Sequence, residues 1–154
     1  NDLERASVYF QTGYPSHPDI SGYLPTDYNT ALSLYGDGFV HYRRGEYAAS
    51  RDLLLSATRY FFAHKAAMMT AMCLQLIAAT CQKLGDLDEA LTFAHNGISQ
   101  QELAPNPVQH YHLMRRMLKL QRQRGIRPAL VTYGWRYFLA RTRANKWHAR
   151  GAAQ

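Results

Sequence analysis

The residue types that usually carry chemistry are present in this chain, but their spacing builds no catalytic set. His110 and His112 are two residues apart, which would point their side chains about 200° apart around a helix. Cys73 and Cys81 fall in one expected helix, separated by about 12 Å along its axis, which is too far for a disulfide. The sequence holds neither a phosphate-binding loop nor a dinucleotide-binding glycine pattern. We therefore expect a protein that is not an enzyme and uses no cofactor and no metal.

The acidic and cysteine residues have structural explanations. Asp86, Asp88 and Glu89 fall at the expected start of a helix, where acidic side chains cap the helix and interact favourably with its dipole. The two cysteines are interpreted as small buried apolar side chains. They give no sign of an oxidising compartment, and no run of about 18 apolar residues could span a membrane. A cytoplasmic location is therefore expected.

Charge is distributed unevenly along the chain. Residues 1–114 carry 7 Lys and Arg against 11 Asp and Glu, whereas residues 115–154 carry 11 Lys and Arg and no acidic residue. This asymmetry predicts an acidic partner for the C-terminal third. Four basic residues near the end of the chain would form one stripe on a helix: Arg136, Arg143, Lys146 and Arg150. Four interpretations of this stripe stay open: a solvent-exposed face, a docking surface for an acidic protein, a nucleic-acid-binding surface, and a face lying on a membrane.

The rest of the sequence predicts helices and no strands. The 154 residues, 47% of them hydrophobic, suit a single domain with its own core. Glycines and prolines make residues 1–27 an expected extended or short-helical leader. A helical domain is expected over residues 28–147 and a basic tail over residues 148–154. Apolar residues at spacings of three and four predict helices close to residues 28–45, 47–61, 66–84, 87–98, 107–124 and 128–146.

Three glycines set the predicted architecture. Gly45, Gly85 and Gly125 each fall between two expected helices, at a constant spacing of 40 residues. Glycine suits such turns because it readily adopts the left-handed backbone that ends a helix. The regular spacing predicts an all-α fold of three stacked helix–turn–helix hairpins in a short right-handed solenoid. Small residues are expected where the two helices of a hairpin cross: Gly38 with Ser50, and Ala78 with Ala90.

The hairpins resemble the tetratricopeptide repeat over about residues 30–140. The second hairpin carries the resemblance best, with Ala78, Gly85, Asp86, Leu87, Glu89, Ala90 and Leu91. The first is similar, with Gly38, Tyr42, Gly45, Tyr47, Ser50, Leu54 and Ala57. The third keeps Gly125 but has Leu118 and Leu130 where small residues are usual. The period of 40 exceeds the family's repeat of about 34 residues, which implies longer helices. In size, hairpin number and leader, the chain also resembles the bacterial type III secretion chaperones, which hold an aggregation-prone subunit before export.

The tetratricopeptide resemblance implies a concave groove lined by the first helix of each hairpin. The expected lining is aromatic at one end, small and polar in the middle, and cationic at the other. It comprises Leu32, Tyr35, Phe39, Tyr42 and Arg43 from the first hairpin; Met72, Gln75, Ala79, Gln82 and Lys83 from the second; and His112, Arg115, Lys119, Arg122 and Gln123 from the third. Such a lining predicts a protein partner with hydrophobic and acidic features. The aromatic residues could instead be covered by the chain's own leader.

The function expected from these features is an adaptor or chaperone that holds a segment of a partner protein. One branch of the family binds C-terminal carboxylates, but it requires asparagines where this chain has Phe39 and Leu76, so we do not expect that activity. Two alternatives remain: a nucleic-acid-binding helical protein that uses the basic C-terminal third, and a structural subunit of a larger assembly.

Overall fold

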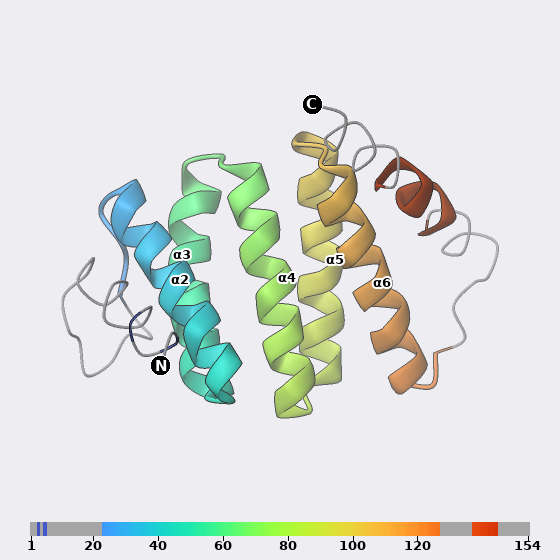
Figure 1. The fold of residues 1–154 in the computed structure, drawn as a ribbon, viewed down its shortest axis with the longest axis horizontal. Helices are drawn as coiled ribbons and strands as arrows, with labels where there is room; N and C mark the ends of the chain where they lie inside the picture. Colours follow the sequence, from blue (N-terminus) through green and yellow to red (C-terminus); the bar gives the residue numbers. More distant parts are fainter. Residues whose placement is uncertain (1–2, 4, 6–22, 127–136, 145–154) are drawn as a thin grey trace.

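The computed structural model describes Leu3, Arg5, residues 23–126 and residues 137–144, and the described part is all-α (Figure 1). Five helices follow one another with short links between them. They are α2 (Tyr28–Arg44), α3 (Tyr47–Ala63), α4 (Ala67–Leu84), α5 (Leu87–Leu103) and α6 (Pro107–Gln123). Residues 137–144 are also helical. The remainder of the helix expected over 128–146 lies outside the described residues.

The helices stack as consecutive hairpins (Figure 1). Each helix from α2 to α6 packs against the next, and in addition α2 contacts α4 and α4 contacts α6. The first helices of the hairpins, α2, α4 and α6, are therefore neighbours and form one layer of the stack. This arrangement confirms the predicted all-α fold of stacked hairpins and is compatible with a helical repeat.

All three turn glycines adopt the left-handed backbone. The φ angles are 85° at Gly45, 92° at Gly85 and 73° at Gly125. A side chain makes this region unfavourable for most residues, so glycine suits each turn. The link between α3 and α4 uses the same region without glycine, because Lys65 has φ 56°. The repeat period thus marks the turn inside each hairpin, while the link between the first two hairpins carries no glycine signal.

Helix starts follow the expected capping chemistry at two places. The Asp27 carboxylate accepts a hydrogen bond from the backbone N–H of Thr30 at 2.9 Å, at the start of α2. The Asn106 side chain accepts one from the N–H of Gln109 at 3.0 Å, before the proline that opens α6. Each bond satisfies an N–H group that the first turn of a helix leaves without a partner.

The expected end of the fourth helix at Ile98 is wrong, because α5 continues to Leu103. Gly97, next to the expected end, lies inside the helix at a close contact. A Cβ at Gly97 would come within 2.8 Å of a Leu113 methyl group. The buried residues Ala90, Ala94, Gly97 and Gln101 continue the spacing of three and four through the whole of α5.

The acidic residues at the start of α5 form ion pairs rather than a side-chain cap. Asp86 precedes α5 and makes no capping hydrogen bond with its side chain. Instead Arg51 of α3 lies 3.7 Å from Asp86 and 3.6 Å from Glu89, and Arg124 lies 2.6 Å from Asp88. These exposed pairs connect the second hairpin to both of its neighbours. Each contributes little to stability, but together they place these acidic groups beside α3 and the end of α6.

The core lies between the two helices of each hairpin and between successive hairpins. Gly38 is a close crossing point of α2 and α3: a Cβ there would lie 2.8 Å from Leu54 Cγ, and Ser50 Oγ donates a hydrogen bond to the Gly38 carbonyl at 2.7 Å. Ala78 and Ala90 are both fully buried in one cluster. The small residues expected at the crossings therefore lie where close packing requires them.

Cys73 and Cys81 are buried free thiols, as the sequence predicted. Burial first of all raises the pKa of each to about 12, so both are protonated at neutral pH. Cys81 Sγ donates a weak hydrogen bond to the Glu89 carboxylate at 3.4 Å. In the described part of the chain, no helix has the length and apolar character needed to cross a membrane.

Candidate partner-binding groove

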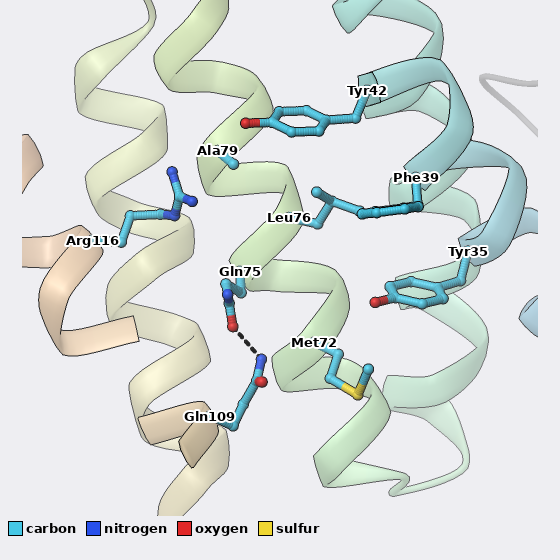
Figure 2. A pocket seen from close by; sticks show the side chains of 9 residues that line it. All are labelled: Tyr35, Phe39, Tyr42, Met72, Gln75, Leu76, Ala79, Gln109 and Arg116. Carbon is cyan, nitrogen blue, oxygen red and sulfur yellow. Dashed lines mark hydrogen bonds between the residues drawn. The ribbon is translucent and has the colours of Figure 1, made fainter. Parts of the chain in front are cut away.

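A pocket of about 260 Å³ opens on the side of the stack formed by α2, α4 and α6 (Figure 2). The three helices that line it are the first helices of the three hairpins. Its walls are Tyr35, Phe39, Tyr42, Met72, Gln75, Leu76, Ala79, Gln109 and Arg116. Side chains far apart in sequence therefore meet in one hollow because the hairpins stack in register.

One wall of the pocket is aromatic. Tyr35, Phe39 and Tyr42 come from α2 at spacings of four and three, so one face of the helix presents all three (Figure 2). Phe39 is 41% exposed, and Tyr35 and Tyr42 are half-buried. The Arg43 guanidinium lies 5.8 Å from the centre of the Phe39 ring, within cation–π range. Burial raises the pKa of the Tyr35 hydroxyl, which stays protonated.

The floor of the pocket comes from α4. Ala79 is a small residue between the aromatic wall and Arg116, and the close-up shows Tyr42 and Arg116 extending toward it from opposite sides (Figure 2). Gln109 of α6 donates a hydrogen bond to the side-chain oxygen of Gln75. This bond connects α6 to α4 at the lower edge of the pocket in the view (Figure 2).

The pocket continues into a second, cationic hollow of about 210 Å³. Gln75 and Arg116 line both, and His112, Arg115 and Lys119 of α6 complete the second. The two hollows together form one groove, which we call the inner groove. It changes from aromatic on α2 to cationic on α6.

The structure places most of the expected lining residues in the inner groove. Nine of them line one of the two hollows: Tyr35, Phe39, Tyr42, Met72, Gln75, Ala79, His112, Arg115 and Lys119. Leu32, Lys83 and Arg122 are exposed on the same helices but line neither hollow, Arg43 packs on Phe39, and Gln82 and Gln123 hydrogen bond to each other.

Three lining residues were missed by the sequence analysis: Leu76, Gln109 and Arg116. Leu76 and Arg116 each lie nine residues before a turn glycine. Leu76 was considered only as a position where one branch of the family carries asparagine, and Arg116 was not considered. The 40-residue period relates the two positions, so the signal was present in the sequence. Gln109 lies in the first turn of α6 and has no counterpart among the residues considered.

The basic stripe expected near the end of the chain cannot be assembled here, because Arg136, Lys146 and Arg150 lie outside the described residues. Arg143 is described, and it lines a separate pocket beside the start of α6, together with Asn106 and His110. Across residues 23–126 and 137–144, no group of three or more His, Cys, Asp and Glu side chains is placed to hold a metal ion.

Outside the inner groove, one histidine lies between two carboxylates. His41 Nε2 is 3.6 Å from the buried Asp37 carboxylate, and His41 Nδ1 hydrogen bonds with the exposed Glu46. These partners, Asp37 first, raise the pKa of His41 above its ordinary value of 6.5. Folding therefore favours the protonated imidazole.

Stability should depend on pH through His41. Because its folded pKa is raised, its contribution is complete below pH 6.5 and is lost as the pH rises through the folded pKa. Urea unfolding of the wild type and His41→Gln checks this at about pH 6 and about pH 9. The advantage of the wild type should shrink at the higher pH, by about 1 kcal/mol or less because solvent screens the exposed Glu46. An advantage that is constant or grows with pH would contradict it.

No family model, curated protein or solved structure was found that matches this chain. The function must therefore be inferred from the geometry and chemistry of the inner groove.

Proposed function

We propose that this protein is a non-enzymatic binding protein that holds a segment of a partner protein in the inner groove. The observation that carries the proposal is the aromatic wall, with Phe39 exposed and Tyr35 and Tyr42 half-buried, which lines a hollow between α2, α4 and α6. Aromatic side chains and arginines are the groups that protein interfaces favour. An apolar groove between helices suits an extended segment or one face of a helix.

The narrower form of the proposal is a tetratricopeptide-like adaptor or chaperone in the cytoplasm. Three turn glycines at a period of 40 residues and an inner layer of first helices support it. A role as a type III secretion chaperone is the most specific version. That version predicts that the bound segment belongs to a subunit that aggregates when it is purified without this protein.

A nucleic-acid-binding function is the second candidate, favoured by the cationic side chains along α6. It predicts an affinity whose logarithm falls steeply with the logarithm of salt concentration. The aromatic wall distinguishes the two, since a peptide anchored there by apolar contacts keeps most of its affinity at high salt.

Binding should depend on the aromatic wall. A library of random peptides displayed on phage provides ligands, and fluorescence anisotropy gives their affinities. The Tyr35→Ala/Phe39→Ala variant should bind a selected peptide about a hundredfold more weakly, since truncating two anchors costs about 3 kcal/mol. Phe39→Ala alone removes a half-exposed ring and should weaken binding about tenfold while the protein stays folded by circular dichroism.

The matched control is Phe62→Ala on α3. Phe62 is 64% exposed, but it is not part of the inner groove. This variant should bind as the wild type does. Equal affinities for the wild type, the Phe39 variant and the double variant would show that the groove is not the binding site.

A further inference from the structure

We propose that Arg116 is the specificity residue of the inner groove, and that it binds the side-chain carboxylate of an Asp or Glu within the partner segment. The inference rests on the proposed function and names the chemistry of the partner: an acidic segment with an apolar side chain beside the acid. Neither its charge pattern nor its spacing singled out Arg116 in the sequence.

Arg116 is held in position but has donors left over. Its Nη1 donates a hydrogen bond to Gln82 Oε1 at 3.0 Å, and the Gln82 amide in turn donates to Gln123. The Arg116 Nε lies out of contact with solvent and has no hydrogen-bond partner within the described residues. A guanidinium has five N–H donors. The side-chain amides of Gln82 and Gln123 therefore orient the Arg116 guanidinium and still leave N–H donors for a ligand.

Arg116 is also partly desolvated, and that makes its charge costly. Burial lowers the pKa of Arg116. A buried charge without a partner destabilises the state that contains it, and a hydrogen-bonded carboxylate offsets that cost. An arginine and a carboxylate form paired, charge-assisted hydrogen bonds, which amides and hydroxyls do not match.

The protein itself supplies no carboxylate to this site in the part that the structure describes. Helices α4 and α6 contain no Asp or Glu, and the one acidic residue of α2, Asp37, is buried beside His41. The acidic residues near the start of α5 pair with Arg51 and Arg124. Among the described residues, no acidic side chain lines either hollow of the inner groove, which leaves its cationic end complementary to an acidic ligand.

The position of Arg116 indicates a carboxylate inside the segment rather than at its end. Arg116 lines both hollows, and the groove continues past it to His112 and Lys119. A chain that places an apolar side chain on the aromatic wall and an acid on Arg116 can therefore run on in either direction. In the aromatic hollow Arg116 is the one cation among the lining residues, whereas a nucleic acid strand carries a phosphate at every nucleotide.

Peptide selection tests the proposal. A phage library of random peptides of about a dozen residues, fused so that none has a free C-terminus, is selected on the wild type, Arg116→Gln and Arg122→Gln. The wild type should enrich peptides with an Asp or Glu at a fixed distance from a large apolar residue. Arg122→Gln removes the same charge from an exposed position of α6 and should select the same peptides. Arg116→Gln should keep the apolar residue and lose the acid.

A double-mutant cycle then measures the contact directly. In one peptide selected on the wild type, the acid is replaced by its amide, Glu→Gln or Asp→Asn. This change should weaken binding to the wild type and Arg122→Gln tenfold or more, and should leave binding to Arg116→Gln nearly unchanged. Arg116→Lys keeps a charge without the planar fork and should retain part of the coupling.

The outcomes separate this inference from the proposed function. If binding depends on Phe39 but the acid-to-amide change costs the same in the wild type and in Arg116→Gln, the assignment of Arg116 is wrong while the groove stands. If peptide binding does not depend on Phe39, the proposed function is contradicted, whatever the result for Arg116. If a single-stranded oligonucleotide displaces the peptide, and Arg116→Gln and Arg122→Gln weaken that oligonucleotide equally, the cationic end is a phosphate surface and the acidic-segment proposal is overturned.

Discussion

Phe61→Ala should lower the free energy of unfolding by about 4 kcal/mol, the largest effect expected from any single truncation in the first hairpin. The Phe61 side chain is completely buried in the cluster that joins α2, α3 and α4. Its ring contacts Tyr28 at 5.6 Å and Tyr60 at 5.9 Å between centroids, both edge to face. Alanine removes the apolar transfer energy and these ring contacts, and it leaves a cavity that packed helices fill only in part. Urea unfolding followed by circular dichroism measures the loss.

The neighbouring phenylalanine is the matched control. Phe62 follows Phe61 on the same helix, but its side chain is 64% exposed. Phe62→Ala should therefore change the free energy of unfolding by about 0.5 kcal/mol or less. Both variants lose the same atoms, so any difference between them reports burial alone. Similar losses for the two would mean that α3 does not present the described face to the core.

The order of helices and turns could be predicted because it depends on local chemistry. A left-handed turn favours glycine, and Gly45, Gly85 and Gly125 meet that need wherever a hairpin turns. The cap at Asp27 likewise requires only a carboxylate three residues before an open N–H group. The end of α5 could not be predicted in the same way. Gly97 is a helix breaker by its own propensity, but contact with Leu113, from the next helix, makes a side chain at this position unfavourable.

The aromatic wall of the inner groove was predictable for a different reason. Tyr35, Phe39 and Tyr42 lie on one face of one helix, so their spacing alone brings them together. The 40-residue period relates the position of Arg116 to that of Leu76, but how far the Arg116 side chain reaches into the pocket depends on other helices. Ala79 is small enough to leave room above α4, and Gln82 holds the guanidinium in place. Residue size on a neighbouring helix decides how far a long side chain can reach.

The contact between Gly38 and Leu54 gives a second prediction with a large effect. The effect of Gly38→Ala on stability should change sign when Leu54 is replaced by alanine. In the wild type, a Cβ at Gly38 would lie 2.8 Å from Leu54 Cγ and 3.4 Å from the Ser50 carbonyl oxygen. Leu54 is fully buried, so it cannot move aside without disturbing its neighbours. Gly38→Ala should therefore destabilise the protein by about 1–2 kcal/mol, although alanine is the better helix former by about 1 kcal/mol.

Removing Leu54 should reverse that result. Leu54→Ala alone should cost about 3 kcal/mol through the cavity it creates. In that background the obstructing Cγ is gone, so Gly38→Ala should now stabilise the protein by about 0.5–1 kcal/mol through its helix propensity. The four proteins form a double-mutant cycle measured by urea unfolding, with a coupling of about 2 kcal/mol. If the effects of the two substitutions on the free energy of unfolding were additive, glycine at position 38 would not be required by a close crossing. The proposed physical reason for a small residue at this point of the hairpin would then be wrong. A change of sign would show that the crossing of α2 and α3, which sets the position of the aromatic wall, is fixed by the fit of one glycine against one leucine.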